Sequence, residues 1–177
     1  MATQFEIVIY VKAHGELDSI ARGIFGALGT GEYLVENSPE MGGDYCRLIT
    51  LGLEATVFAN EGPMEDEDFA EYPYGFGVAS TYLDPGLELA AAEGALADYY
   101  ARLIAFNLDV ETATSFYLGG QDGIDEYEIR SFRRNPQFTP DAGPTAQHVY
   151  VSERRTVEYD TDVVEEDFEE DAAFEDE

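Results

Sequence analysis

The chain of 177 residues contains 38 acidic and 9 basic residues, so its formal net charge is −29 at pH 7. A charge of this size repels nucleic-acid phosphates and anionic membrane surfaces, so we expect no direct nucleic-acid partner and no membrane partner. A hydrophobic content of 45%, with 12 tyrosines and 11 phenylalanines, is nevertheless sufficient for the core of one domain.

The N-terminal residues contain a short apolar run, Ile7 to Val11, and no basic leader. The sequence therefore predicts neither export nor membrane insertion, and we expect a cytoplasmic protein. Cys46 is the only cysteine. This excludes an internal disulfide and a cysteine-based zinc cluster.

The first predicted elements are a buried strand, Phe5 to Val11, and an amphipathic helix, Glu16 to Leu28. Gly29-Thr30-Gly31 ends this helix, because glycine adopts the positive φ that a helix C-terminus requires. A short strand at residues 32–36 follows. Tyr45 to Asn60 is strand-like throughout and predicts one or two antiparallel strands, with Gly52 at a bulge or hairpin corner.

The second half of the domain is predicted to begin with an acidic loop, Glu61 to Glu71, and a strand, Tyr74 to Leu83. Asp84-Pro85 predicts the start of a long helix that ends near Leu108. Two closing strands, Thr114 to Leu118 and Asp125 to Phe132, complete the domain. The apolar residues predicted to face inward from the long helix are Leu89, Leu96, Tyr100 and Leu103.

This order of elements predicts an α+β fold, with an antiparallel or mixed sheet and two helices packed on one face. Residues 1–134 are predicted to form this single domain. Residues 135–157 are predicted to form a linker that can add an edge strand at Gln147–Tyr150, and residues 158–177 are predicted to form an acidic, disordered C-terminal tail.

The motifs for metal binding and catalysis that we tested do not fit the chain. An EF-hand started at Asp66 fails because Ala70 and Glu71 occupy its fifth and sixth positions. His14 and His148 form no H-E-x-x-H pair, and there is no G-x-S-x-G elbow. We therefore expect no cofactor, no metal and no catalytic residue, although acid–base chemistry by paired carboxylates stays open.

Residues 63–76 combine clustered carboxylates with aromatic rings, a composition typical of interfaces with a basic partner. The alternative is that the rings enter the core where the next strand begins. The predicted partner contacts in this segment are Glu65, Asp66, Glu67, Asp68, Phe69, Glu71, Tyr72 and Tyr74. Those in the tail are Glu165, Glu166, Asp167, Glu169, Glu170 and Asp171.

The arginines near the end of the domain are the main basic feature of the chain. We expect them to pair with acids of the same domain, while an anion site and an acidic tail folded onto them are alternatives. They are Arg130, Arg133, Arg134, Arg154 and Arg155.

Several glycines and aromatic residues define a resemblance that covers residues 5–134. They are Gly42-Gly43-x-Tyr45, Leu51-Gly52-Leu53, Asn60, Phe69-x-x-Tyr72-Pro73 and the alanine-rich helix. In this pattern the chain resembles small acidic bacterial immunity proteins of polymorphic-toxin systems. The resemblance implies a cytoplasmic, non-catalytic binder that neutralises a cognate toxin.

Charge and resemblance together favour a non-enzymatic acidic protein, of immunity, antitoxin or nucleic-acid-mimic type, that inhibits a basic partner. Such a partner is a toxin, a nuclease or another nucleic-acid-binding protein. Two other classes stay open: a carboxylate-based metal-dependent enzyme, and a structural or assembly protein of a phage or mobile element. The sequence leaves the oligomeric state unspecified.

Overall fold

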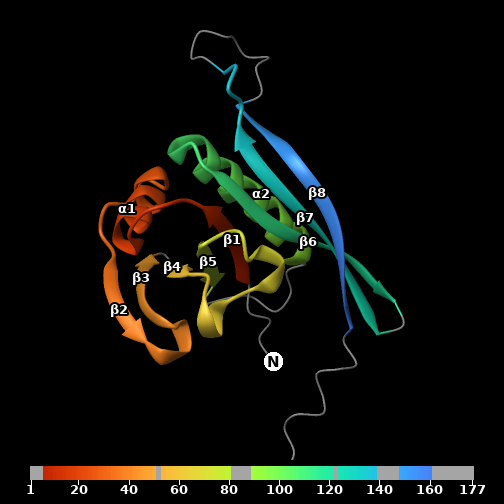
Figure 1. The fold of residues 1–177 in the computed structure, drawn as a ribbon, viewed down its shortest axis with the longest axis horizontal. Helices are drawn as coiled ribbons and strands as arrows, with labels where there is room; N and C mark the ends of the chain where they lie inside the picture. Colours follow the sequence, from red (N-terminus) through yellow and green to blue (C-terminus); the bar gives the residue numbers. More distant parts are fainter. Residues whose placement is uncertain (1–5, 51–52, 81–88, 122, 139–147, 161–177) are drawn as a thin grey trace, which may run out of the picture.

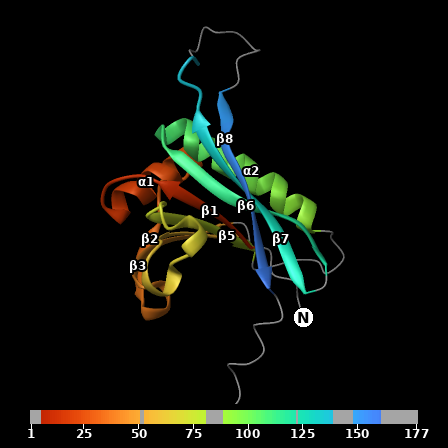
Figure 2. The same ribbon diagram turned by 45° about the vertical axis from the view of Figure 1, so that its right-hand side comes forward.

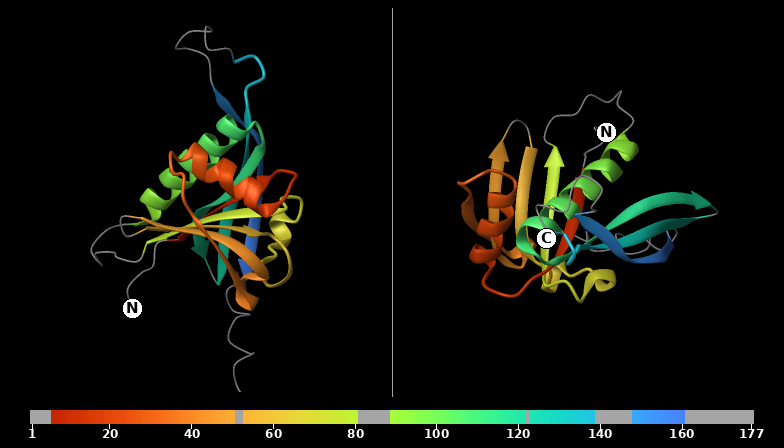
Figure 3. Two further views of the ribbon diagram at one scale, coloured as in Figure 1. Left: turned by 90° about the vertical axis from the view of Figure 1, so that its left-hand side faces the viewer. Right: turned by 90° about the horizontal axis from the view of Figure 1, so that it is seen from above.

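A computed structural model describes residues 6–50, 53–80, 89–121, 123–138 and 148–160. Its strands form one sheet in the order β2-β3-β4-β5-β1-β6-β7-β8, and each neighbouring pair is antiparallel. Both helices lie on the same face of this sheet (Figures 1 and 3). The predicted α+β fold is therefore confirmed, and the sheet is antiparallel throughout the described pairs.

The strands and helices follow the predicted order closely. They are β1 (Glu6–Lys12), α1 (Leu17–Ala27), β2 (Leu34–Ser38), β3 (Gly43–Thr50), β4 (Leu53–Ala59), β5 (Tyr74–Ser80), α2 (Leu89–Leu108), β6 (Glu111–Gln121), β7 (Ile124–Arg134) and β8 (Val149–Asp160). Three short 3₁₀ turns lie between strands: η1 (Pro39–Met41), η2 (Gly62–Met64) and η3 (Glu67–Phe69). The predicted corner at Gly52 and the predicted helix start at Asp84-Pro85 lie outside the described residues.

The edge strand near the C-terminus is longer than the sequence analysis predicted. Instead of a short strand at Gln147–Tyr150, β8 pairs with β7 from Val149 opposite Arg134 to Asp160 opposite Ile124. The last part of the predicted linker and the first residues of the predicted tail therefore belong to the sheet. Residues 161–177 lie outside the described residues.

The main core lies between the sheet and the two helices. From α1, the buried side chains are Ile20, Ala21, Ile24 and Phe25. From α2, they are Ala97, Ala101, Ile104 and Ala105. The predicted inner face of α2 is corrected at Leu96, whose side chain is 37% exposed. The small alanine side chains allow α2 to lie close to β6. At this contact the buried Thr112 hydroxyl donates to the Ala101 carbonyl at 2.9 Å.

Few hydrogen-bonded pairs join the two halves of the sheet. β1 pairs with β6 only from Tyr10 opposite Ala113 to Lys12 opposite Glu111, and beyond this point the two strands diverge. The long strands β6, β7 and β8 then extend beside the β1–β5 half (Figure 2). The segment between β4 and β5 packs against the face opposite the helices, where Tyr10, Phe69, Tyr72, Ala113 and Ile129 form a second apolar cluster.

In the part of the chain that the structure describes, neither helix is both long enough and apolar enough to cross a membrane.

Candidate functional site

Residues 61–73 form the acidic loop that the sequence analysis singled out, and Asn60 holds it in place. The Asn60 side-chain amide donates to the Phe69 and Tyr72 carbonyls, each at 3.0 Å, and its oxygen accepts from the Asp66 backbone N–H at 3.0 Å. Asn60 is only 8% exposed, so these bonds are shielded from water. The loop is consequently a fixed surface.

Two of the predicted partner contacts, Phe69 and Tyr72, are buried. Each is only 2% exposed, and the Phe69 ring stacks on Tyr10 with ring centroids 3.9 Å apart. The Tyr72 hydroxyl lies 3.0 Å from the Ser131 hydroxyl and donates to Glu111 at 3.1 Å. The alternative, in which these rings enter the core, therefore holds for both. They fasten the loop to the sheet and cannot reach a partner while the loop keeps this position.

Two loop carboxylates also serve the fold. Asp66 accepts a hydrogen bond from the Tyr10 hydroxyl at 2.7 Å, and it caps η3 by accepting from the Asp68 N–H at 3.0 Å. Asp68 accepts from the Tyr159 hydroxyl and forms an ion pair with Arg155 on β8. These contacts connect the loop to β1 and β8.

Glu65 and Glu67 are exposed, and neither forms an ion pair with a described residue. Glu71 is also exposed but pairs with Lys12, while Tyr74 is half-buried. The carboxylates of Glu65 and Glu67 are thus the part of the predicted loop surface that stays available. The predicted tail contacts, from Glu165 to Asp171, lie outside the described residues.

The arginines near the end of the domain pair with its own acids, as predicted. Arg130 and Arg154 both contact Glu128, Arg133 contacts Glu111, and Arg155 contacts Asp68. Arg134 differs, because its guanidinium lies over the Phe106 ring at 5.0 Å from the centroid.

A row of tyrosines across β6, β7 and β8 was not predicted from the sequence. Tyr117 lies opposite Tyr127 in the β6–β7 register, with ring centroids 5.3 Å apart, and Tyr159 contacts Tyr127 at 5.4 Å. Tyr117 is 55% exposed and Tyr159 is 41% exposed. The Tyr117 hydroxyl donates to Asp125 at 3.4 Å.

This row continues directly into the acidic loop. Tyr159 lines a shallow depression together with Glu65, Asp66, Glu67 and Asp68. We name the combined surface the acidic tyrosine face, and define it as Glu65, Glu67, Tyr117, Asp125, Tyr127 and Tyr159. Rings beside carboxylates that form no ion pair with a described residue therefore exist in this chain, but all the rings of this face come from strands β6, β7 and β8.

The hydroxyl of Tyr159 is held in its neutral form. Burial raises the pKa of Tyr159, and its hydrogen bond to Asp68 and the charge of that carboxylate raise it further. Burial likewise raises the pKa of Tyr10, together with the hydrogen bond to Asp66. Both hydroxyls consequently remain donors that hold the loop at neutral pH.

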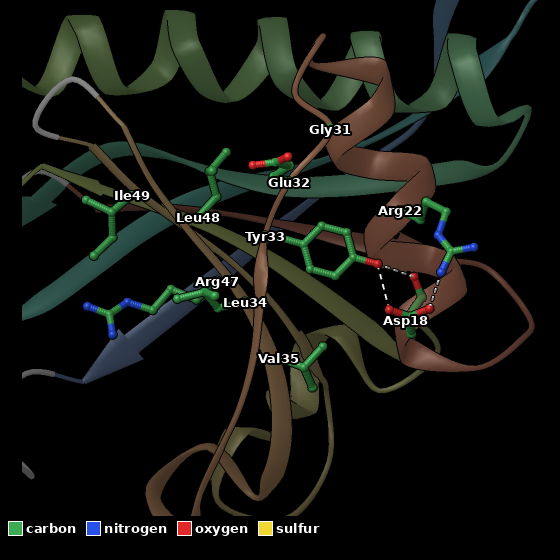
Figure 4. Close-up of a pocket in the computed structure, with 10 residues that line it drawn as sticks. All are labelled: Asp18, Arg22, Gly31, Glu32, Tyr33, Leu34, Val35, Arg47, Leu48 and Ile49. Carbon is green, nitrogen blue, oxygen red and sulfur yellow. Dashed lines mark hydrogen bonds and ion pairs between the residues drawn. The ribbon is translucent and has the colours of Figure 1, made fainter.

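A second candidate surface is a groove of about 770 Å³ between α1 and the β2–β3 pair (Figure 4). The Tyr33 hydroxyl donates to the Asp18 carboxylate at 2.7 Å across one end of this groove. Leu34, Val35 and Ile49 line it and are exposed. Sequence analysis assigned no function to this region.

Among the described residues, no group of three or more His, Cys, Asp and Glu side chains could hold a metal ion. Cys46 is buried, and burial raises the pKa of its thiol, which disfavours the thiolate required for metal binding.

Comparisons of the chain with protein-family models, with curated proteins and with solved structures found no match.

Proposed function

We propose that the chain is a non-enzymatic acidic binding protein that captures and inhibits a basic protein through the acidic tyrosine face. The proposed partner is a toxin, a nuclease or another nucleic-acid-binding protein, and the proposed biological role is that of an immunity protein or antitoxin. The fixed loop and the paired strands of this face present a preorganised surface, which reduces the entropy lost on binding.

The observation that carries this proposal is the distribution of charge. Among the described residues, every lysine and arginine except Arg134 forms an ion pair with a carboxylate. With 38 acidic and 9 basic residues, most carboxylates of the chain have no basic residue to neutralise them. Their field attracts a cationic macromolecule and accelerates its association by about 10- to 1000-fold.

The tyrosines add short-range recognition to this long-range attraction. A guanidinium group can stack on an exposed tyrosine ring while it pairs with a neighbouring carboxylate, and both contacts favour arginine over lysine. Such a contact already exists within the chain, because the Arg130 guanidinium lies over the ring of Phe116 on β6, at 4.0 Å from the ring centroid. We therefore expect arginines at the centre of the partner's contact surface.

The proposal is tested by capture on the immobilised full-length chain from a lysate of the organism that encodes it. Bound proteins are eluted with a salt gradient and identified. We expect a basic protein whose retention falls steeply with salt, because screening weakens contacts between exposed charges. Its affinity is then measured for Tyr117→Ser and for Tyr99→Ser, a matched control on α2 that is 56% exposed against 55% for Tyr117.

We expect Tyr117→Ser to weaken binding by about tenfold, the usual effect of losing one aromatic anchor, and Tyr99→Ser to change it less than about twofold. A double replacement, Glu65→Gln with Glu67→Gln, should slow association more than Glu16→Gln with Asp109→Asn at distant positions. Capture of no basic protein, or equal losses for Tyr117→Ser and Tyr99→Ser, would contradict the proposal.

A further inference from the structure

The β2 edge of the sheet is incompletely paired. β2 is the terminal strand of the sheet, so its outer side faces no other strand of the described residues. β2 is also short. Its pairing with β3 ends at Leu34 opposite Arg47, whereas β3 continues along β4 as far as Thr50 opposite Leu53. Backbone groups of β2, and of residues 48–50 on the β2 side, therefore lack a strand partner.

This edge also carries the most exposed large aliphatic side chains among the described residues. Leu34 is 65% exposed, and Val35 and Ile49 are each 59% exposed. Leu34 and Val35 are consecutive strand residues, so they point to opposite faces of the sheet. Ile49 lies two residues from Arg47, the partner of Leu34, and therefore shares a face with Leu34. An added strand would cover apolar surface on both faces.

The charges around the edge define what it can accept. Glu32 lines the groove, as Figure 4 shows, and forms no ion pair with a described residue. The two arginines nearby are already neutralised. Arg22 pairs with Asp18 at 2.7 Å, and Arg47 contacts both Glu36 at 3.1 Å and Glu54 at 2.9 Å. The groove therefore has a surplus of negative charge.

We propose that this edge binds an extended, positively charged segment of another protein as an additional antiparallel strand. The backbone of the segment pairs with the open edge, its apolar residues cover Leu34 and Ile49, and its basic residues face Glu32 and the other acids of the rim. A second copy of this chain is disfavoured because each copy has a net charge of −29. Residues 161–177 are disfavoured for the same reason, since they contain acids and no lysine or arginine.

The proposal concerns a surface separate from the acidic tyrosine face, so it does not depend on the proposed function. The probe is a synthetic peptide of eight alternating valine and arginine residues. The control peptide has the same sequence and charge but carries N-methyl groups on amides of both edges, which prevents strand pairing. Calorimetry on the full-length chain measures both affinities at physiological salt.

We expect the unmodified peptide to bind at least about tenfold more tightly than the methylated peptide. Leu34→Lys should weaken its binding by about tenfold, while Leu118→Lys should change it less than about twofold. The two variants add the same charge, and Leu118 is similarly exposed at 52% near the end of the β6–β7 hairpin. The peptide should also slow hydrogen exchange of the outward-facing amides in residues 34–38.

Equal binding of the two peptides, or equal effects of the two lysine variants, would show attraction by charge alone and would overturn the proposal. A sedimentation mass that falls from dimer to monomer in Leu34→Lys would overturn it in favour of a second copy. The Tyr117→Ser variant separates this test from that of the proposed function, because it should leave binding of the peptide unchanged.

Discussion

Asn60 provides the most direct test of how the acidic loop is held. It is the last residue before the loop, and its side chain makes contacts that neither alanine nor a larger apolar residue can replace. In Asn60→Ala the Tyr72 carbonyl and the Asp66 N–H both lose their Asn60 partner. The Phe69 carbonyl loses one of two donors but keeps the Tyr72 N–H at 2.8 Å.

The expected cost follows from these losses. A buried hydrogen bond contributes about 1 kcal/mol net, and a buried polar group without a partner costs about 1–3 kcal/mol. Two such groups and one weakened carbonyl in Asn60→Ala together amount to about 3–4 kcal/mol, a large part of the 5–15 kcal/mol that holds a typical domain folded. For a chain of this length, the melting temperature should fall by about 10 °C.

Urea unfolding measures this loss, and hydrogen exchange in residues 61–73 reports whether the loop loosens. Asn37→Ala is the control, because Asn37 is exposed and its amide donates to the exposed Asp44 at 2.7 Å. The control should lose less than about 0.5 kcal/mol. A loss below about 1 kcal/mol in Asn60→Ala, with loop exchange unchanged, would refute the assignment of Asn60 as the anchor.

Three further outcomes follow from the packing and the buried hydroxyls. Gly75→Ala should destabilise the fold by about 1–3 kcal/mol in urea unfolding, because a Cβ there would lie 2.2 Å from the buried Phe58 ring. Gly26→Ala, on the exposed side of α1 with no atom within 4 Å of the new Cβ, should stabilise by about 0.5–1 kcal/mol in the same assay. Burial raises the pKa of Tyr10 and Tyr72 above the ordinary value of 10.0. Below pH 10 both tyrosine hydroxyls are neutral in the folded and in the unfolded chain, so they do not change the stability. Above pH 10 these two tyrosines lose their protons in the unfolded chain but keep them in the folded chain, so stability falls as pH rises. Unfolding free energies at about pH 8 and about pH 11 should therefore differ less in the Tyr10→Phe, Tyr72→Phe double variant.

The order of strands and helices could be predicted because local patterns specify it. The β-branched run of β1 and the three- and four-residue spacing in α1 each point to one structure. The end of α1 was predicted equally well, since Gly29 adopts φ +75° there. The inner face of α2 was predicted only in part, because Tyr100 packs against the core whereas Leu96 is 37% exposed. The close approach of α2 to β6 instead requires alanine, and that requirement appears only when the two elements meet.

The acidic loop shows a similar limit in the candidate site. The sequence singled out its carboxylates and rings, but Phe69 and Tyr72 face the sheet, where they cover Tyr10 and Ile129 on the side opposite the helices. A loop that must shield apolar surface supplies its own rings for the purpose. Composition alone cannot distinguish rings that fasten a loop from rings that meet a partner.

The exposed rings of the acidic tyrosine face depend on strand register, which the sequence leaves undefined. Tyr117 and Tyr127 become neighbours only because β6 and β7 pair with these residues opposite each other, and Tyr159 joins them only because β8 extends to Asp160. A slip of one residue would turn a whole strand over and separate these rings. Net charge therefore indicates what kind of partner is attracted, whereas the pairing of β6, β7 and β8 determines where that partner finds rings and carboxylates together.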